Sequence, residues 1–491
     1  MEKKENLKTS IVFSFISQLI CYLAPLIVSP YLSRVLGASG VGEYSYAYSY
    51  VFYFSSAILF GFSSYGINQI SERRNDKLQY STVFWTILFE RFCFFVVSLS
   101  IYILLIYFHC FDESINSSIL YVLSLILVAN VFDISFLFQG LEQFRIVSYG
   151  QMVVNVAYLI CVFLFVKSSD DLLFYTLIKS LIGLGLDGFL WMFSIKKITK
   201  PHIDKKAIVR IFMASSQFFL PTILMSAGTQ IDQTFIGLFC GNKEVAYYQQ
   251  ASKIPSLISN FIYAIAPVML SRISFLFKEN KIEEVKEKIG KATNLALFLS
   301  IPCCLGVYLI GNYFVPTYFG EEYLPAINVL YCLLPVTLFS PLSSILINSY
   351  YYPCNEIKKA TYFLAMSLIL NSLLTFIFTK YTNLGAKGAA IATLFAEIFL
   401  FSLLLKFSKN ILSFKTLFCD LWKVLVASAF MCLGVFLINY FAKDLSQIII
   451  CIIDILSGIV IFFLFSCFLK EKIIVQVLLN IKSKLSKKRE K

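Results

Sequence analysis

The stretch "SPYLSRVLGASGVGEYSYAY", residues 29–48, connects two long apolar runs, 11–32 and 43–65. Each run is long enough to cross a bilayer as a helix, which takes about 20 mostly apolar residues. Arg34 lies at the end of the first run, where a charge is costly unless a partner or a function compensates for it. The stretch therefore predicts two consecutive membrane-spanning helices with an arginine at the membrane boundary.

The composition of the whole chain is typical of an integral membrane protein. Its 491 residues are 58% hydrophobic and 14% charged, and its mean hydropathy is +0.76. Soluble domains are closer to half apolar and a quarter charged. The net charge of +13 does not indicate nucleic-acid binding, because the basic residues are spread over alternating loops rather than gathered in one patch.

Apolar runs of spanning length follow one another along almost the entire chain. The first is too long for a secretory signal peptide and leads directly into the second. We predict an all-α membrane protein with fourteen spans: 11–32, 43–65, 82–108, 117–138, 147–166, 172–194, 211–238, 247–270, 293–314, 326–350, 360–379, 386–405, 421–441 and 447–469.

The basic residues predict the orientation of these spans. With the N-terminus in the cytoplasm, 32 of the 42 Lys and Arg residues fall in inner segments, 6 in outer segments and 4 within runs. Inner loops carry the excess of Lys and Arg in membrane proteins. We therefore expect both termini in the cytoplasm. The outer loops, of which 315–325 is the longest, leave no room for an extracellular catalytic domain.

A short repeat predicts two related halves. "GASGVGEYSYA" (37–47) and "GNKEVAYYQQA" (241–251) share Gly, Val, Tyr and Ala at four equivalent positions, and each joins an outward span to an inward one. A parallel repeat is a transporter plan, with a binding site between the halves near the bilayer midplane. The expected parts are an N-terminal lobe of six spans (1–200), a C-terminal lobe of six (201–410), two further spans (411–470) and a basic cytoplasmic tail (471–491).

Signatures of catalysis and metal binding are missing from the sequence. It contains no G-x-x-x-x-G-K-[ST] loop and no G-x-S-x-G turn. The thirteen cysteines are scattered without a C-x-x-C pair, and the two histidines, His109 and His202, lie in predicted loops. We therefore expect no enzyme activity, no metal site and no bound cofactor.

Basic residues at or inside the spans are candidates for binding an anionic substrate. Arg91 lies deep in the third run, Lys179 in the sixth and Lys253 in the eighth, while Arg34 lies at the outer end of the first. A guanidinium group can bind two phosphate oxygens at once. Long basic side chains near helix ends can also reach the interface, so a purely structural role for each stays open.

Acidic residues inside the spans are candidates for ion coupling. Asp133, Asp187, Asp232 and Glu397 lie within or at the ends of apolar runs, with Glu397 the deepest. A carboxylate at membrane depth can carry a proton or bind sodium during a transport cycle. Pairing with a buried cation is the structural alternative.

Several ordered segments resemble those of bacterial oligosaccharide-unit flippases. These are the Wzx or O-antigen translocase group of polysaccharide biosynthesis proteins in the MOP (MATE-like) superfamily. Beside the opening stretch, which continues as "VFYFSSAILFGFSSYGINQIS", the similar segments are "DISFLFQGLEQFRIVSYGQMVVNV" (133–156), "DQTFIGLFCGNKEVAYYQQASKI" (232–254), "FGEEYLPAINVL" (319–330) and "LGAKGAAIATLFAE" (384–397).

The resemblance implies a MATE-like fold and a flippase without enzyme activity. Its substrate would be an undecaprenyl-diphosphate-linked oligosaccharide repeat unit, turned from the cytoplasmic to the outer face of the cytoplasmic (inner) membrane for O-antigen, capsule or exopolysaccharide assembly. The mechanism would be alternating access coupled to a proton or sodium gradient, with the polymerase and chain-length proteins of the same pathway as partners. The residues in family-typical motifs are Arg34, Asp133, Gln139, Gly140, Glu142, Asp232, Lys253 and Glu397.

Three alternatives stay open at this point. A multidrug or cation exporter of the same superfamily predicts acid-dominated cavities and commonly twelve spans. A flippase for another polyprenyl-linked precursor would share the basic residues. A polymerase or ligase normally needs a sizeable outer loop, which this sequence does not contain.

Overall fold

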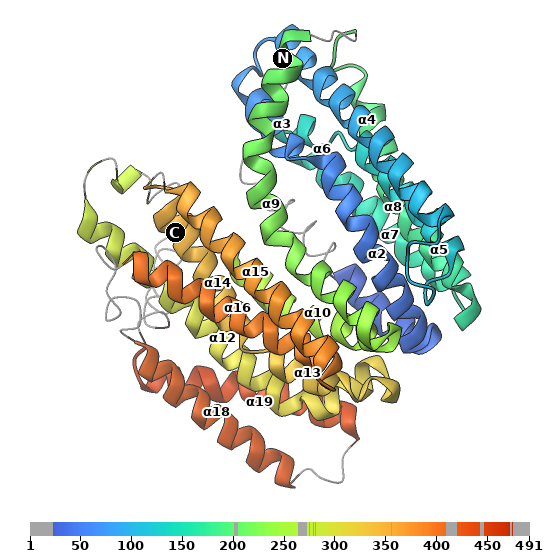
Figure 1. The fold of residues 1–491 in the computed structure, drawn as a ribbon. Helices are drawn as coiled ribbons and strands as arrows, with labels where there is room; N and C mark the ends of the chain where they lie inside the picture. Colours follow the sequence, from blue (N-terminus) through green and yellow to red (C-terminus); the bar gives the residue numbers. More distant parts are fainter. Residues whose placement is uncertain are drawn as a thin grey trace, which may run out of the picture. The chain divides into compact units, whose positions relative to one another are not determined.

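The computed structural model describes residues 23–200, 205–263, 273, 275–277, 279, 281–354, 356–408, 420–441, 446–471 and 474. Every regular element in these ranges is a helix (Figure 1). Twelve helical segments are long and apolar enough to cross a membrane. The predicted all-helical, multi-pass membrane fold is therefore confirmed.

Each of the twelve segments coincides with one of the fourteen predicted spans. Two predicted spans, 11–32 and 247–270, are not among the twelve. Residues 11–22 and 264–270 lie outside the described part of the chain, as does almost all of the expected basic tail. The count of fourteen stays a prediction.

The chain divides into two compact units, Met1–Ala246 and Tyr247–Lys491. The first unit contains residues 205–240 (α9) together with the preceding helices. The predicted lobes, which follow the sequence repeat, divide at residue 200 instead. The lobe boundaries stay a prediction. After a helical stretch at 23–35, the first unit contains α2 (Gly37–Leu59), α3 (Phe62–Glu72), α4 (Lys77–Tyr107), α5 (Ser117–Phe132), α6 (Ser135–Gly140), α7 (Phe144–Phe165), η1 (Ser169–Asp171), α8 (Leu172–Ser194) and α9 (Lys205–Cys240).

Helix α10 (Asn242–Tyr263) crosses from the first unit into the second. In the second unit, α18 and α19 pair with each other and both pack against α12. The other described helices of this unit are α12 (Ile282–Phe319), η2 (Glu321–Tyr323), α13 (Ala326–Leu333), α14 (Val336–Leu346), η3 (Ile347–Tyr351), α15 (Ile357–Tyr381), α16 (Gly385–Phe407), α18 (Leu421–Phe441) and α19 (Gln447–Phe468).

Helix α5 packs against α2, α4 and α8 in the first unit. The second span and the fourth span, to which α5 belongs, are both interrupted. The second span breaks at Phe60 and Gly61, which both adopt left-handed backbone conformations. The fourth span breaks at Asp133, which is extended, and at Ile134, which is also non-helical, before α6 begins. Hydropathy predicted each of these spans as one continuous run.

Gly42 allows α2 to approach the start of α10 within the first unit. A Cβ atom at this position would lie 1.7 Å from the backbone carbonyl oxygen of Asn242. The two residues belong to the two copies of the repeated segment. Gly42 of the first copy therefore packs directly on Asn242 of the second, with no space for a side chain.

Replacing Gly42 by alanine is expected to lower the free energy of unfolding by about 2 kcal/mol or more, because a backbone atom cannot move aside as a side chain can. The midpoint of thermal unfolding in detergent measures the change. Gly188→Ala is the matched control, since a Cβ there meets no atom within 4 Å and alanine favours the helix. Equal midpoints for the two variants would contradict the close approach.

Candidate functional site

Arg91, on α4, is fully buried in the first unit. Its Nη1 donates to the backbone carbonyl oxygen of Asp133 at 2.5 Å, and its Nη2 donates to the hydroxyl of Ser63 at 2.6 Å. Its guanidinium carbon lies 4.9 Å from the centroid of the Phe136 ring. Ser63 follows the break in the second span and Asp133 ends α5, so one guanidinium group joins two helix breaks.

The backbone groups left without helical partners at the break after α5 form hydrogen bonds with three side chains. The carbonyl oxygen of Phe132 accepts a hydrogen bond from Nε1 of Trp191 on α8 at 3.0 Å. The carboxylate of Asp133 accepts from the backbone amide of Ser135, at the start of α6, at 2.9 Å. Non-helical backbone at membrane depth is tolerated where protein groups satisfy it. The hydrogen bonds of Arg91 and Trp191 meet this requirement.

Asp187 belongs to the same region of the first unit. It is 4% exposed and lies close enough to Arg91 and Asp133 to interact with both electrostatically. Together with Trp191 and three other residues it lines a cavity of about 360 Å³. Of the eight predicted site residues, the structure therefore brings together Arg91, Asp133 and Asp187.

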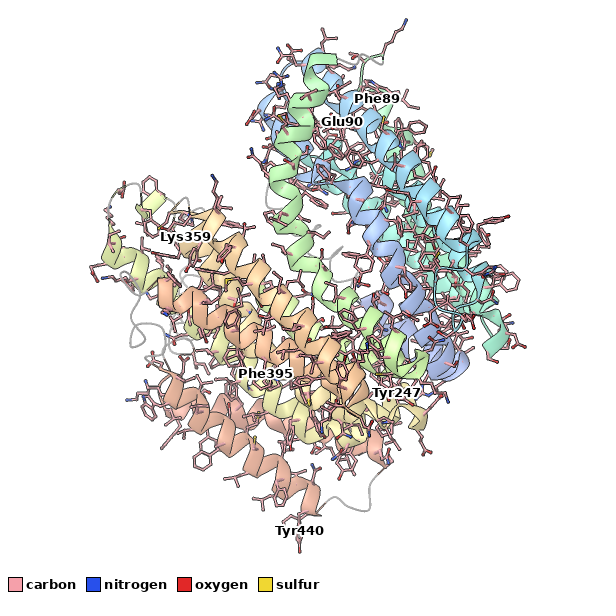
Figure 2. The ribbon with its side chains drawn as sticks, in the orientation of Figure 1. Phe89, Glu90, Tyr247, Lys359, Phe395 and Tyr440 are labelled. Atoms are coloured by element: carbon pink, nitrogen blue, oxygen red, sulfur yellow. The ribbon has the colours of Figure 1, made fainter. Side chains whose placement is uncertain are left out.

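Glu90 is a neighbouring buried acid that is visible in the sequence within the third apolar run, but it is not among the eight predicted site residues. It is 4% exposed, and neither carboxylate oxygen has a hydrogen-bond partner in the described ranges. Figure 2 labels it on α4 beside Phe89. Its position next to Arg91 in an apolar run marks it as a candidate functional residue, because acids at membrane depth are rare and are usually functional.

Lys179 lies in a different, tyrosine-rich part of the first unit. Its Nζ is 4.8 Å from the ring centroid of Tyr158 on α7. Tyr175, one turn before Lys179 on α8, packs edge-on against Tyr44 of α2 at 4.9 Å. No carboxylate of the described residues interacts electrostatically with Lys179. The ammonium group is thus held against an aromatic face rather than neutralised by an acid.

The other two predicted residues of the first unit differ in environment. Arg34 is exposed. Asp232, on α9, is fully buried and interacts electrostatically with Tyr53 of α2. Two residues further along, the hydroxyl of Thr234 lies 2.9 Å from that of Tyr53. Asp232 therefore lies in a polar contact between α2 and α9.

In the second unit, Glu397 on α16 ends a short chain of hydrogen bonds. The hydroxyl of Ser340, on α14, donates to Oε1 of Glu397 at 3.2 Å. The hydroxyl of Tyr263, on α10, lies 2.6 Å from that of Ser340. Oε2 of Glu397 is buried and has no hydrogen-bond partner among the residues that the structure describes. One carboxylate oxygen is thus held in place by Ser340, whereas the other has no described partner.

Lys253, on α10, is half-buried in the second unit. With Glu397 it completes the eight predicted residues, six in the first unit and two in the second. A central cavity lined by basic residues from both lobes stays a prediction.

Comparison with known proteins places the chain in a family. The family model described as polysaccharide biosynthesis protein matches residues 7–277. The chain belongs to this family. The predicted resemblance is therefore confirmed at the level of the family.

Two known proteins are similar to this member of the polysaccharide biosynthesis protein family. A protein of Escherichia coli (strain K12) described as an O-antigen transporter is 23% identical over 83% of this chain and 98% of its own length. A teichuronic acid biosynthesis protein of Bacillus subtilis (strain 168) is 25% identical over 36% of this chain and 38% of its own.

Solved structures confirm the predicted superfamily fold. The lipid II flippase MurJ, in an inward closed conformation, superposes with a TM-score of 0.72 at 20% identity, covering 95% of this chain and 99% of MurJ. An inward-facing multidrug resistance MATE transporter of the MOP superfamily gives 0.66 at 14% identity, covering 80% and 94%. This family member thus has the helical fold of MOP-superfamily transporters.

Proposed function

We propose that this protein is a flippase for polyprenyl-diphosphate-linked oligosaccharides. It moves the repeat unit from the cytoplasmic to the outer face of the cytoplasmic membrane, where the unit enters O-antigen, capsule or exopolysaccharide. The observation that carries the proposal is the match to the O-antigen transporter over 98% of that protein's length. The fold shared with a lipid II flippase supports it, because both proteins would move a lipid-linked glycan.

The substrate joins parts that need different surroundings. Its diphosphate and sugars need polar or cationic groups, whereas its lipid tail can stay in the bilayer. Arg34, Lys179 and Lys253 are the proposed contacts for the diphosphate or sugars. Lys179 is well suited, because no described carboxylate neutralises its ammonium group and ammonium groups bind phosphate as point charges.

Arg91 has a different role in this proposal. Its two outer nitrogens already donate to Asp133 and Ser63, and its side chain is fully buried. Arg91 therefore positions the helices that surround the transport path and does not contact the substrate.

Coupling to an ion gradient is part of the proposal. Glu397 is the proposed coupling residue, because one of its oxygens has no described partner. A proton is the proposed coupling ion, since Oε2 of Glu397 is buried without a described hydrogen-bond partner and a carboxylate oxygen can hold a proton without further ligands. Asp187 and Asp232 are further proposed coupling residues.

Placement in the membrane follows from the proposed function. The protein acts without catalysing a covalent step, in the inner membrane, with both termini in the cytoplasm. The polymerase and chain-length proteins of the same pathway are its proposed partners.

Deletion of the gene in its own strain tests the function. The expected result is loss of surface polysaccharide, with lipid-linked repeat units trapped on the cytoplasmic face and transport restored by the wild-type gene. Inverted and right-side-out vesicles report on which face the precursor lies. Precursor that reaches the outer face but stays unpolymerised would contradict flipping and indicate a polymerase. Normal polysaccharide with altered drug sensitivity would indicate an exporter.

A further inference from the structure

A cavity of about 470 Å³ lies within the second unit, lined by residues of α10, α12, α18 and α19. Its wall is almost entirely aliphatic and aromatic, with Ile258, Phe298, Val307 and Phe462 among the lining residues. The volume is in the range of small-molecule sites, about 300–1,000 Å³. None of the basic residues proposed to contact the glycan substrate lines this cavity.

Asp454 is the acidic residue in the described lining of this cavity. It lies in α19, about two turns from the helix start at Gln447, and is 2% exposed. Neither of its carboxylate oxygens has a hydrogen-bond partner in the part of the chain that the structure describes. The amide of Asn439 on α18 is nearby, but without the geometry of a hydrogen bond.

A carboxylate in this position is costly without a partner. Buried acceptors without donors cost free energy, and acids inside the membrane are rare unless they have a role. Packing of α18 on α19 does not need an acid here, because the neighbouring lining residues Ile455, Gly458 and Ile459 are apolar or small. No lysine, arginine or histidine is among the described lining residues, so the cavity lacks a positive charge beside Asp454.

The rest of the wall is apolar. Apart from Asp454 and the Cys303 thiol, the described lining residues are aliphatic, aromatic, methionine, glycine or proline. The matching occupant therefore carries one polar group toward Asp454 and has an apolar body.

We propose that this cavity binds a small lipophilic amine, whose ammonium group pairs with Asp454 while its hydrocarbon body fills the apolar space. Charge complementarity selects the amine over a neutral hydrocarbon chain. An ammonium group supplies up to three donors and a positive charge, which matches a carboxylate whose two oxygens lack partners. The inference does not rest on the proposed flippase function.

Two probes that differ in one group test the proposal: 1-adamantylamine and its neutral counterpart 1-adamantanol. Equilibrium dialysis with the purified full chain in phosphatidylcholine nanodiscs measures both affinities. We expect the wild type to bind the amine about tenfold or more tightly than the alcohol, because a charged hydrogen bond is stronger than a neutral one. Asp454→Asn should remove this preference and keep alcohol binding.

Two further variants separate the carboxylate from the cavity. Asp170→Asn changes an exposed acid of the first unit and should keep the preference for the amine. Val307→Phe fills the cavity from α12 and keeps the carboxylate of Asp454. It should weaken the binding of both probes. This variant also tests the site if Asp454→Asn fails to fold. Thermal unfolding of each variant reports on folding.

Three results would overturn the proposal. Equal binding of the two probes to the wild type would assign the cavity to a neutral hydrocarbon such as an isoprenoid chain. A preference for the amine that survives Asp454→Asn would place the ammonium group elsewhere. Absence of binding by either probe to the folded wild type would exclude a small-molecule site of this class.

Discussion

Replacing Arg91 by alanine is expected to lower the free energy of unfolding by about 3 kcal/mol or more. The variant removes two hydrogen bonds of a charged donor, to Asp133 and to Ser63. It leaves a buried carbonyl oxygen without a donor at a helix break and opens a cavity in a packed interior. The midpoint of thermal unfolding in detergent and the yield of folded protein measure the loss.

Two variants control for charge and for position. Arg91→Lys keeps the charge, but a single ammonium group cannot reproduce the planar fork that reaches both partners, so an intermediate loss is expected. Arg74→Ala breaks an ion pair with Glu142 whose side chains are 48% and 62% exposed, and should cost less than about 1 kcal/mol. A wild-type midpoint for Arg91→Ala, together with lost transport, would instead identify Arg91 as a substrate contact.

Replacing Glu397 by glutamine is expected to reduce gradient-driven transport at least tenfold while the protein stays folded. Glutamine has nearly the same shape but cannot take up or release a proton. Glu397 is held by Ser340 through one oxygen and has no described partner at the other. Accumulation of the lipid-linked repeat unit in inverted vesicles, with and without an imposed pH gradient, measures the effect.

The neighbouring residues provide graded controls for Glu397. Ser340→Ala removes the hydroxyl that donates to Oε1, and should weaken the response to the pH gradient without abolishing transport. Glu321→Gln alters an exposed acid between α12 and α13 and should behave as wild type. Unchanged sensitivity to the gradient in Glu397→Gln would assign this carboxylate a structural role. It would not contradict the proposed flippase function, which the deletion experiment tests separately.

The helices could be predicted from sequence because a spanning helix is encoded locally, by the length of an apolar run. The breaks could not, because the run 43–65 stays apolar through Phe60 and Gly61, and the single Asp133 in the run 117–138 does not by itself end a helix. Gly61 was a signal for a left-handed residue, but Phe60, which is also left-handed, was not. The burial of Arg91 followed from its depth in the run. Its partners did not, because a backbone carbonyl freed by a break leaves no mark in the sequence.

Asp454 shows the opposite case. An acid in the apolar run 447–469 was visible in the sequence. The cavity that it lines could not be predicted, because side chains from four helices form it. Glu397 was selected for its depth, but its contact with Ser340 depends on how α14 packs against α16. Depth is a property of one helix, whereas a site is a property of several.

The guanidinium group that joins two helix breaks makes the second and fourth spans mechanically dependent on each other. A hinge at Gly61 that opened alone would pull Ser63 away from Arg91, and one at Asp133 would pull away the carbonyl. Bending at either point therefore breaks a charged hydrogen bond unless both spans turn together about α4. Helices α3 and α6, which follow the two breaks, are thus tied to a common pivot on α4, so they can tilt together more readily than either can bend alone.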